Sequence, residues 1–160
     1  MLPLLALYLT QAEATEIGSG RAFGLGIQLG EPSGLTGKFY LGGRRNAIDF
    51  TIGAYYADNG PWNDAIYAQA AYHWHLTELA HGNGVSIPFR VGIGGFFTSG
   101  YYRWSDRDYD VVLGARVPIG LDFDLDAAPV QFYAEIGFQL TVAPPFRVGG
   151  DGAIGVRYYF

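Results

Sequence analysis

Eight segments of this 160-residue chain alternate apolar residues with polar or small ones at a period of two. Residues 130–140 show the pattern plainly, since Phe132, Ile136 and Phe138 occupy even positions while Gln131 and Glu135 occupy odd ones. A strand directs successive side chains to opposite faces, whereas an amphipathic helix needs a repeat near 3.6 residues, which no segment sustains. The alternation therefore predicts an all-β protein.

The connections between these segments predict how the strands pair. All are of hairpin length, including the two longer ones at 57–64 and 99–109. Strands joined in this way pair antiparallel with their neighbours in sequence, and eight of them can close into an up-and-down barrel. We therefore predict a closed, antiparallel eight-stranded β-barrel with short turns at one end and longer loops at the other. The expected strands are 23–29, 35–41, 48–55, 66–76, 87–97, 111–123, 130–140 and 151–160.

The distribution of charge predicts which face of the barrel wall meets lipid. No charged residue lies on the apolar face of any predicted strand, although 16% of the chain is charged. An eight-stranded barrel has room inside for few large side chains, so the many Phe, Ile and Leu residues of this face are expected to point outward. The chain is therefore predicted to be a transmembrane β-barrel with a polar lumen.

Four basic and four acidic residues fall on the predicted inner face. An unpaired charge inside a barrel of low dielectric constant is costly, so equal numbers of the two signs predict an internal ion-pair network. Such a network either fixes the barrel wall or forms an ion path or gate, and the filled interior of an eight-stranded barrel favours the first. The residues are Lys38, Asp49, Arg90, Arg116, Asp122, Glu135, Asp151 and Arg157.

The first residues are typical of an export signal. Leu2–Leu9 form a short apolar run, and Ala12-Glu13-Ala14 follows it with the small residues of a cleavage site. This pattern predicts a signal peptide over 1–14 and a single barrel domain over 15–160. No basic residue precedes Arg21, which indicates that the start of the leader is truncated.

Composition excludes several classes of site. There is no cysteine, and so neither a disulfide nor a thiolate metal site, and the net charge of −5 argues against nucleic acid as a partner. His73 and His75 point to the same side of one strand, but no convincing third ligand accompanies them, so they are weak metal candidates. We expect no cofactor.

The end of the chain resembles a known assembly signal. Val156, Tyr158 and Phe160 alternate on the apolar face of the last strand, and Phe160 ends the chain. This pattern is similar to the C-terminal signal that the β-barrel assembly machinery recognises in bacterial outer-membrane proteins. The length of the mature chain also resembles the OmpA transmembrane domain and OmpX. The resemblance implies a Gram-negative outer membrane, periplasmic termini, extracellular longer loops, and contact with outer-membrane lipid and lipopolysaccharide.

Three segments resemble an uncharacterised family of small bacterial outer-membrane barrels more narrowly. They are the first hairpin with its GEPSGLTGK sequence at 30–38, the GARVPIGL segment at 114–121, and the C-terminal GAIGVRYYF at 152–160. This resemblance implies the barrel and no established activity. Pro118 lies within a predicted strand and cannot donate to a ladder, so we expect a β-bulge there that redirects Arg116.

The leading functional hypothesis is a non-enzymatic barrel with a structural or surface-interaction role. Its extracellular loops are expected to bind a protein or glycan, or to sit at the membrane boundary beside lipopolysaccharide. A narrow channel for small or hydrophobic solutes is the alternative, and a lipid A-modifying enzyme is third. Enzymes of the PagL and PagP types need a His toward the extracellular end, whereas His73, His75 and a turn residue, His81, fall at the other. The loop residues proposed for contacts are Trp62, Tyr101, Tyr102, Arg103, Trp104, Arg107 and Tyr109.

Overall fold

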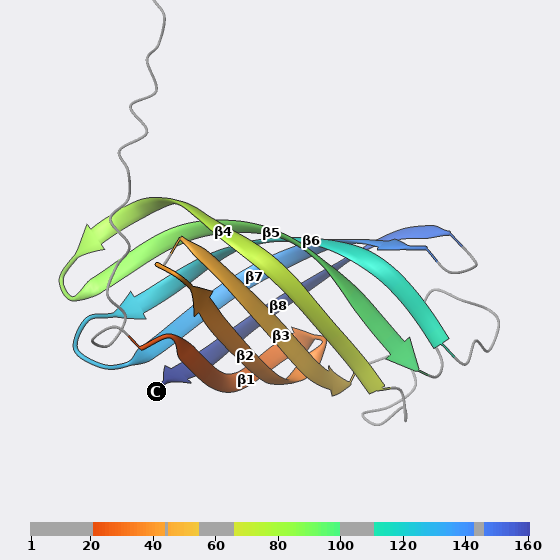
Figure 1. Ribbon diagram of the computed structural model, residues 1–160, viewed down its shortest axis with the longest axis horizontal. Coiled ribbons are helices and arrows are strands. Elements are labelled where there is room, and N and C mark those ends of the chain that lie inside the picture. The colour runs from red at the N-terminus through yellow and green to blue at the C-terminus, as the bar shows by residue number, and fades with distance from the viewer. Residues whose placement is uncertain (1–20, 44, 55–65, 100–110, 143–145) are drawn as a thin grey trace, which may run out of the picture.

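The protein is a closed antiparallel barrel of eight strands, each hydrogen-bonded to the next, with β8 closing onto β1 (Figure 1). This confirms the predicted all-β, eight-stranded, up-and-down architecture. The computed structural model describes residues 21–43, 45–54, 66–99, 111–142 and 146–160. The strands are β1 Phe23–Glu31, β2 Ser33–Leu41, β3 Asn46–Ala54, β4 Ile66–Gly82, β5 Val85–Ser99, β6 Val111–Leu125, β7 Val130–Thr141 and β8 Arg147–Tyr159.

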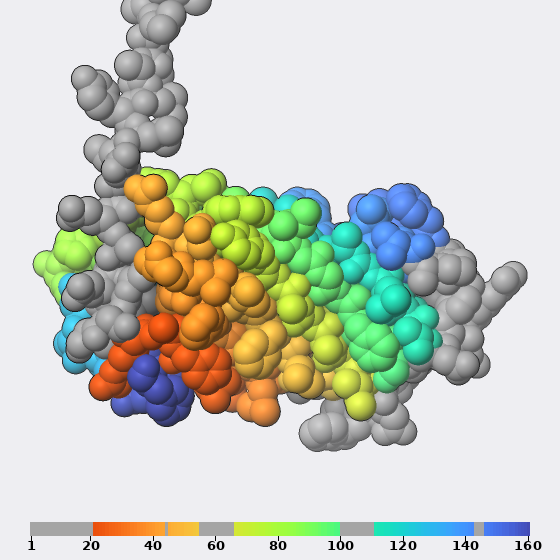
Figure 2. Space-filling model, in the orientation of Figure 1, coloured from red at the N-terminus to blue at the C-terminus, as the bar shows by residue number. Residues whose placement is uncertain are grey.

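The barrel wall has the polarity of a water-soluble protein turned inside out. Large apolar side chains point outward, and Ile52, Ile136 and Ile154 are each more than half exposed. The alternate positions point inward, where polar residues such as Gln28 and Arg90 are almost completely buried. The space-filling view shows how closely the strands' side chains cover the outer wall (Figure 2). No α-helix long and apolar enough to cross a membrane occurs among the described residues.

We call the end of the barrel at which β1 begins and β8 ends the terminal rim, and the opposite end the distal rim. At the terminal rim, β4 and β5 are joined by Asn83 and Gly84 alone, with φ values of 56° and 81°. Two successive residues of positive φ make the type I′ turn that suits a hairpin, and Asn-Gly is its preferred sequence. Both strands therefore run further than the alternation predicted, and His81 lies in β4 and not in a turn.

The expected bulge at Pro118 is wrong. Pro118 lies opposite Gly137 in an unshifted register with β7, and the register with β5 is the same at Val91–Ile119 and Gly94–Arg116 on either side of it. No paired residues lie between Val91–Ile119 and Gly94–Arg116, and this gap in the pairing of β5 with β6 accommodates the missing N–H of Pro118 without an inserted residue. The register shifts of the described barrel lie between β4 and β5, at His75/Thr77 and at Glu78/Ala80.

Two strand edges project past their neighbours. At the terminal rim, β3 begins opposite Trp74, and among the described residues the part of β4 beyond it, 76–82, pairs with β5 alone. At the distal rim, the last β1 residue, Glu31, lies opposite Gly152, so in the part of the chain that the structure describes Arg147–Asp151 of β8 pairs with β7 alone. The blue hairpin of β7 and β8 reaches past the ends of β1 and β2 in Figure 1.

Candidate functional site: the charged lumen

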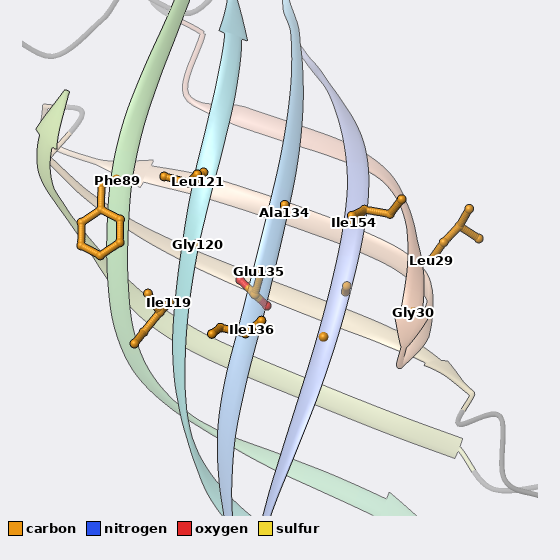
Figure 3. Close-up of a pocket in the computed structure, with 12 residues that line it drawn as sticks. Leu29, Gly30, Phe89, Ile119, Gly120, Leu121, Ala134, Glu135, Ile136 and Ile154 are labelled. Atoms are coloured by element: carbon orange, nitrogen blue, oxygen red, sulfur yellow. The ribbon is translucent and has the colours of Figure 1, made fainter. Parts of the chain in front are cut away.

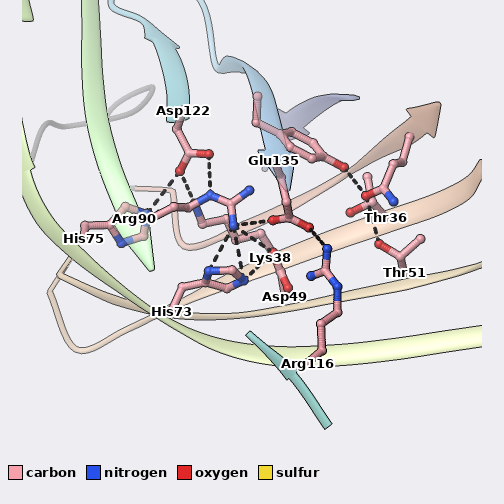
Figure 4. A network of polar contacts seen from close by, with 12 residues as sticks. Thr36, Lys38, Asp49, Thr51, His73, His75, Arg90, Arg116, Asp122 and Glu135 are labelled. Carbon is pink, nitrogen blue, oxygen red and sulfur yellow. Dashed lines mark hydrogen bonds and ion pairs between the residues drawn. The ribbon is translucent and has the colours of Figure 1, made fainter. Parts of the chain in front are cut away.

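The candidate site is a chain of charged side chains that fills the middle of the lumen (Figure 4). The alternation of each strand directs these residues inward. Every strand from β2 to β8 except β4 contributes at least one of the charges, and β4 contributes His73 and His75. The structure places all eight predicted charges on this inner face. They are Lys38 of β2, Asp49 of β3, Arg90 of β5, Arg116 and Asp122 of β6, Glu135 of β7, and Asp151 and Arg157 of β8.

Asp122 is the centre of the part nearest the terminal rim. Its carboxylate lies 2.5 Å from Lys38 Nζ and 2.9 Å from Arg90 Nε. His75 Nε2 is 3.1 Å from the same carboxylate and 2.9 Å from Lys38 Nζ. The side chains of Lys38, Asp122 and Arg90 are inaccessible to solvent. One carboxylate therefore contacts two buried cations, and its loss would leave Lys38 buried without that counter-charge.

Arg90 links this part to the middle of the lumen. Its Nη1 lies 2.6 Å from Glu135 Oε2 and 3.6 Å from Asp49 Oδ2, and 3.0 Å from His73 Nδ1. Asp49 in turn lies 2.9 Å from His73 Nε2 and 3.4 Å from Arg157 Nη2. The guanidinium thus joins β5 to β3, β4 and β7 at one point.

Arg116 extends the chain toward the distal rim. Its Nη2 donates to Glu135 Oε1 at 2.8 Å, and its Nε donates to Asp151 Oδ2 at 2.7 Å. Because Glu135 contacts both Arg90 and Arg116, the polar contacts are continuous from His75 to Asp151. Gln139 Nε2 also donates to Asp151 and to the hydroxyl of Tyr67, which continues the contacts on neutral side chains.

Asp49, His73 and Glu135 have the composition of a metal site, since their ligand atoms all lie within 4.8 Å of one another. The guanidinium of Arg90, however, lies in contact with all three of them and supplies the positive charge. Asp49, His73 and Glu135 therefore surround the Arg90 guanidinium and are not arranged around an open position for a metal. His75 faces a different acid, Asp122, so the two predicted histidines do not meet at one site.

Neutral polar residues surround the charges and complete the filling of the lumen. Tyr133 donates to Gln28 Oε1 at 2.7 Å, and the guanidinium of Arg157 lies 4.0 Å from the centre of the Tyr133 ring. Arg157 also donates to Thr36 Oγ1 at 2.7 Å. Through Gln28, the remaining strand, β1, joins the network. The whole wall is thus tied together across the lumen.

The sequence analysis missed one buried acid. Asp124 is 2% exposed and accepts a hydrogen bond from Gln131 Nε2 at 2.7 Å. The expected strand ends at 123, one residue before Asp124, whereas β6 continues to Leu125. The signal was present, because Asp124 follows Asp122 by two residues and so continues the inward alternation.

The remaining predicted residues lie elsewhere. Tyr158 and Phe160 are exposed on the outer wall at the terminal rim, with ring centroids 5.1 Å apart. Val156 belongs to the same outer face and lines an apolar hollow. The seven loop residues proposed for partner contacts fall in 55–65 and 100–110, outside the described residues, as does the leader at 1–14.

Comparison with protein-family models, with curated proteins and with solved structures finds no match to this chain.

Proposed function

We propose that this protein is an integral bacterial outer-membrane β-barrel with a side-chain-filled lumen, and that its role is structural or depends on contacts made by its extracellular loops. The observation that carries the proposal is the inverted polarity of the wall. Exposed Leu, Ile, Val and Phe side chains cover the outside, while the guanidinium groups of Arg90, Arg116 and Arg157 are buried inside. Water would solvate this outer wall poorly, whereas a lipid bilayer solvates it well.

The filling of the lumen favours a closed barrel and argues against a conducting channel. Lys38, Arg90 and Asp122 are fully buried, and so they occupy the space that an aqueous path would need. Opening such a path would separate buried ion pairs, each costing several kcal/mol when one partner is lost. No observation on the described residues favours the alternative of a solute channel. We therefore assign any contact with a partner to the loops at the distal rim, which face the outside of the cell in the proposed orientation.

The proposal is tested first by membrane behaviour. The folded protein should sediment with the outer membrane, require detergent to remain monodisperse, and migrate on gels at a position that changes after boiling. A closed barrel resists unfolding by unheated detergent, which is why the two positions differ. Protein that stays monodisperse in buffer without detergent would contradict the proposal, because its apolar belt would then be stable in water.

The closed lumen is tested separately by conductance. Purified protein in planar bilayers should give no reproducible single-channel current, and liposomes that contain it should not swell in small sugars. Arg90→Ala, which removes the side chain joining the two halves of the network, is the matched variant and should conduct more than the parent. A stable open current from the parent protein would show that the side-chain plug is not closed.

A further inference from the structure

Two apolar hollows on the outer wall meet and form one trough, part of which is seen in Figure 3. One hollow has a volume of about 580 Å³, and the other, nearer the terminal rim, has a volume of about 380 Å³. Their linings share Leu29, Ala134 and Ile154. The trough exists because two outer-face positions, Ala134 and Gly152, carry small residues beside long ones such as Ile136, which lies opposite Gly152.

The trough runs nearly parallel to the barrel axis. From Ala134 to Gly152 the register moves two residues along β7, about 7 Å, and one strand sideways, about 5 Å, so this step turns roughly 35° away from the strands. The strands of such a barrel tilt from its axis by about 35–45°. On the near wall of Figure 1 the strands descend toward the distal rim while the strand number rises upward from β1 to β4, so a distal step to the next-numbered strand offsets the tilt. A lipid acyl chain, which lies along the membrane normal, therefore fits the trough lengthwise.

Polar groups follow the trough at its distal end, where β1 stops. Glu31, the last residue of β1, lies opposite Gly152, and beyond this point Arg147–Asp151 of β8 pairs with β7 alone among the described residues. The backbone N–H groups on the β1 side of that stretch are hydrogen-bond donors that no described strand uses. Arg147 is exposed, and it is the one basic residue that the structure describes at the distal rim outside the lumen. An apolar trough that ends in donors and a cation matches an acyl chain that ends in a phosphorylated head group.

We propose that this site binds lipid A, the phosphorylated glycolipid of the outer leaflet, with one acyl chain in the trough and a phosphate on the guanidinium of Arg147. The inference rests on the proposed function, which places the distal rim at the outer surface of the outer membrane. The acyl chain covers apolar side chains such as Leu29 and Ile154, each of which is more than half exposed. A phospholipid of the inner leaflet would enter from the terminal end, where Phe123 and Phe132 line the trough and give its phosphate no cation.

Native mass spectrometry of the purified protein in detergent micelles measures the binding, with lipid A as the probe. Ala134→Leu and Gly152→Val fill the trough, and each should weaken binding about tenfold. Both new side chains point outward, and a Cβ at Gly152 meets its nearest atoms at 3.7 and 4.0 Å, so the wall should be undisturbed. Ala115→Leu adds the same bulk to the exposed outer face of β6, outside both hollows, and is the matched control. Equal binding by Ala134→Leu and Ala115→Leu, with the folding of both verified by heat-modifiable migration, would overturn the trough as the site.

Lipid A without its phosphates tests the head group. Arg147→Gln should lower the affinity for lipid A about tenfold, because it removes a charge-assisted contact, and it should leave the affinity for the phosphate-free lipid unchanged. Arg45→Gln, which removes an exposed charge at the terminal rim, is the control and should alter neither affinity. Equal effects of the two glutamine variants would overturn the assignment of the phosphate to Arg147.

Phosphatidylglycerol, an anionic phospholipid, tests whether the site selects lipid A. The parent should bind phosphatidylglycerol about tenfold more weakly, since its phosphate belongs to a different head group. A protein that meets every membrane test and yet binds the two lipids equally would overturn this inference and leave the proposed function intact. Failure of the membrane tests by a protein whose binding of lipid A still depends on Ala134 and Arg147 would contradict the proposed function alone.

Discussion

Replacing Ile136 with arginine tests whether lipid surrounds the outer wall. Ile136 lies near the middle of β7 with its side chain 56% exposed on the outer face. An arginine at the midplane of a bilayer costs about 2–4 kcal/mol of folding free energy. Val130, at the start of the same strand, lies about 20 Å away along the chain, or about 15 Å along the axis of a barrel whose strands tilt by roughly 40°. That places it near the interface, where an arginine costs only about 0–1 kcal/mol.

The measurement is the free energy of unfolding in phosphatidylcholine vesicles, followed through the fluorescence of the three tryptophans during denaturation. Ile136→Ala is the control, because it removes the same apolar contacts without adding a charge. We expect the order of stability to be parent, then Val130→Arg, then Ile136→Arg. A wall in contact with water would instead leave both arginine variants within about 0.5 kcal/mol of the control, as for ordinary surface changes. That result would refute the assignment of the outer face to lipid.

Two further substitutions test the lumen and the closure of the barrel. Asp122→Ala should lower the free energy of unfolding by about 3–5 kcal/mol, because Lys38 and Arg90 remain buried without their shared carboxylate. Denaturation in vesicles measures this loss. A loss under about 1 kcal/mol, the size of an ordinary hydrogen bond, would show that the network contributes little to stability. Gly26→Ala should cost about 1–3 kcal/mol, because the new Cβ would overlap the backbone carbonyl of Val156 where β1 meets β8. An unchanged temperature for the heat-dependent gel shift of Gly26→Ala would contradict that close approach.

The sequence predicts the face of a residue much better than it predicts the contacts of that residue. A period of two assigns Lys38 and Asp122 to the inner face without any knowledge of where the strands end. That these two meet depends on how β2 and β6 lie across the lumen, which the tilt and register of the whole barrel decide. The same limit applies to His73 and His75, whose spacing predicts a shared side of β4 but not their separate acids.

Strand ends were the least predictable part of the fold. Leu76 and Leu79 are both exposed although they are three residues apart, so the strict period of two is broken in the bulged part of β4. We ended the strand at Leu76 because a regular period stops there. At Pro118 the prediction erred in the other sense, because it expected an irregularity where the strand is regular. The missing N–H needs only a local gap in hydrogen bonding, and the alternation around Pro118 continues unchanged.

The lumen network also constrains how the chain can fold. Lys38 and Asp122 are 84 residues apart in sequence, and Arg157 and Asp49 are 108 residues apart. A partly formed sheet that lacks β6 to β8 therefore contains Lys38 without Asp122, and Arg90 without Asp122 and Glu135, and it gains these pairs only when the last strands arrive. Folding should then be nearly all-or-none and slow, as long-range contacts require. A strand that slipped by one residue would turn its charge toward the apolar side of the wall, so the same ions select the correct register during assembly.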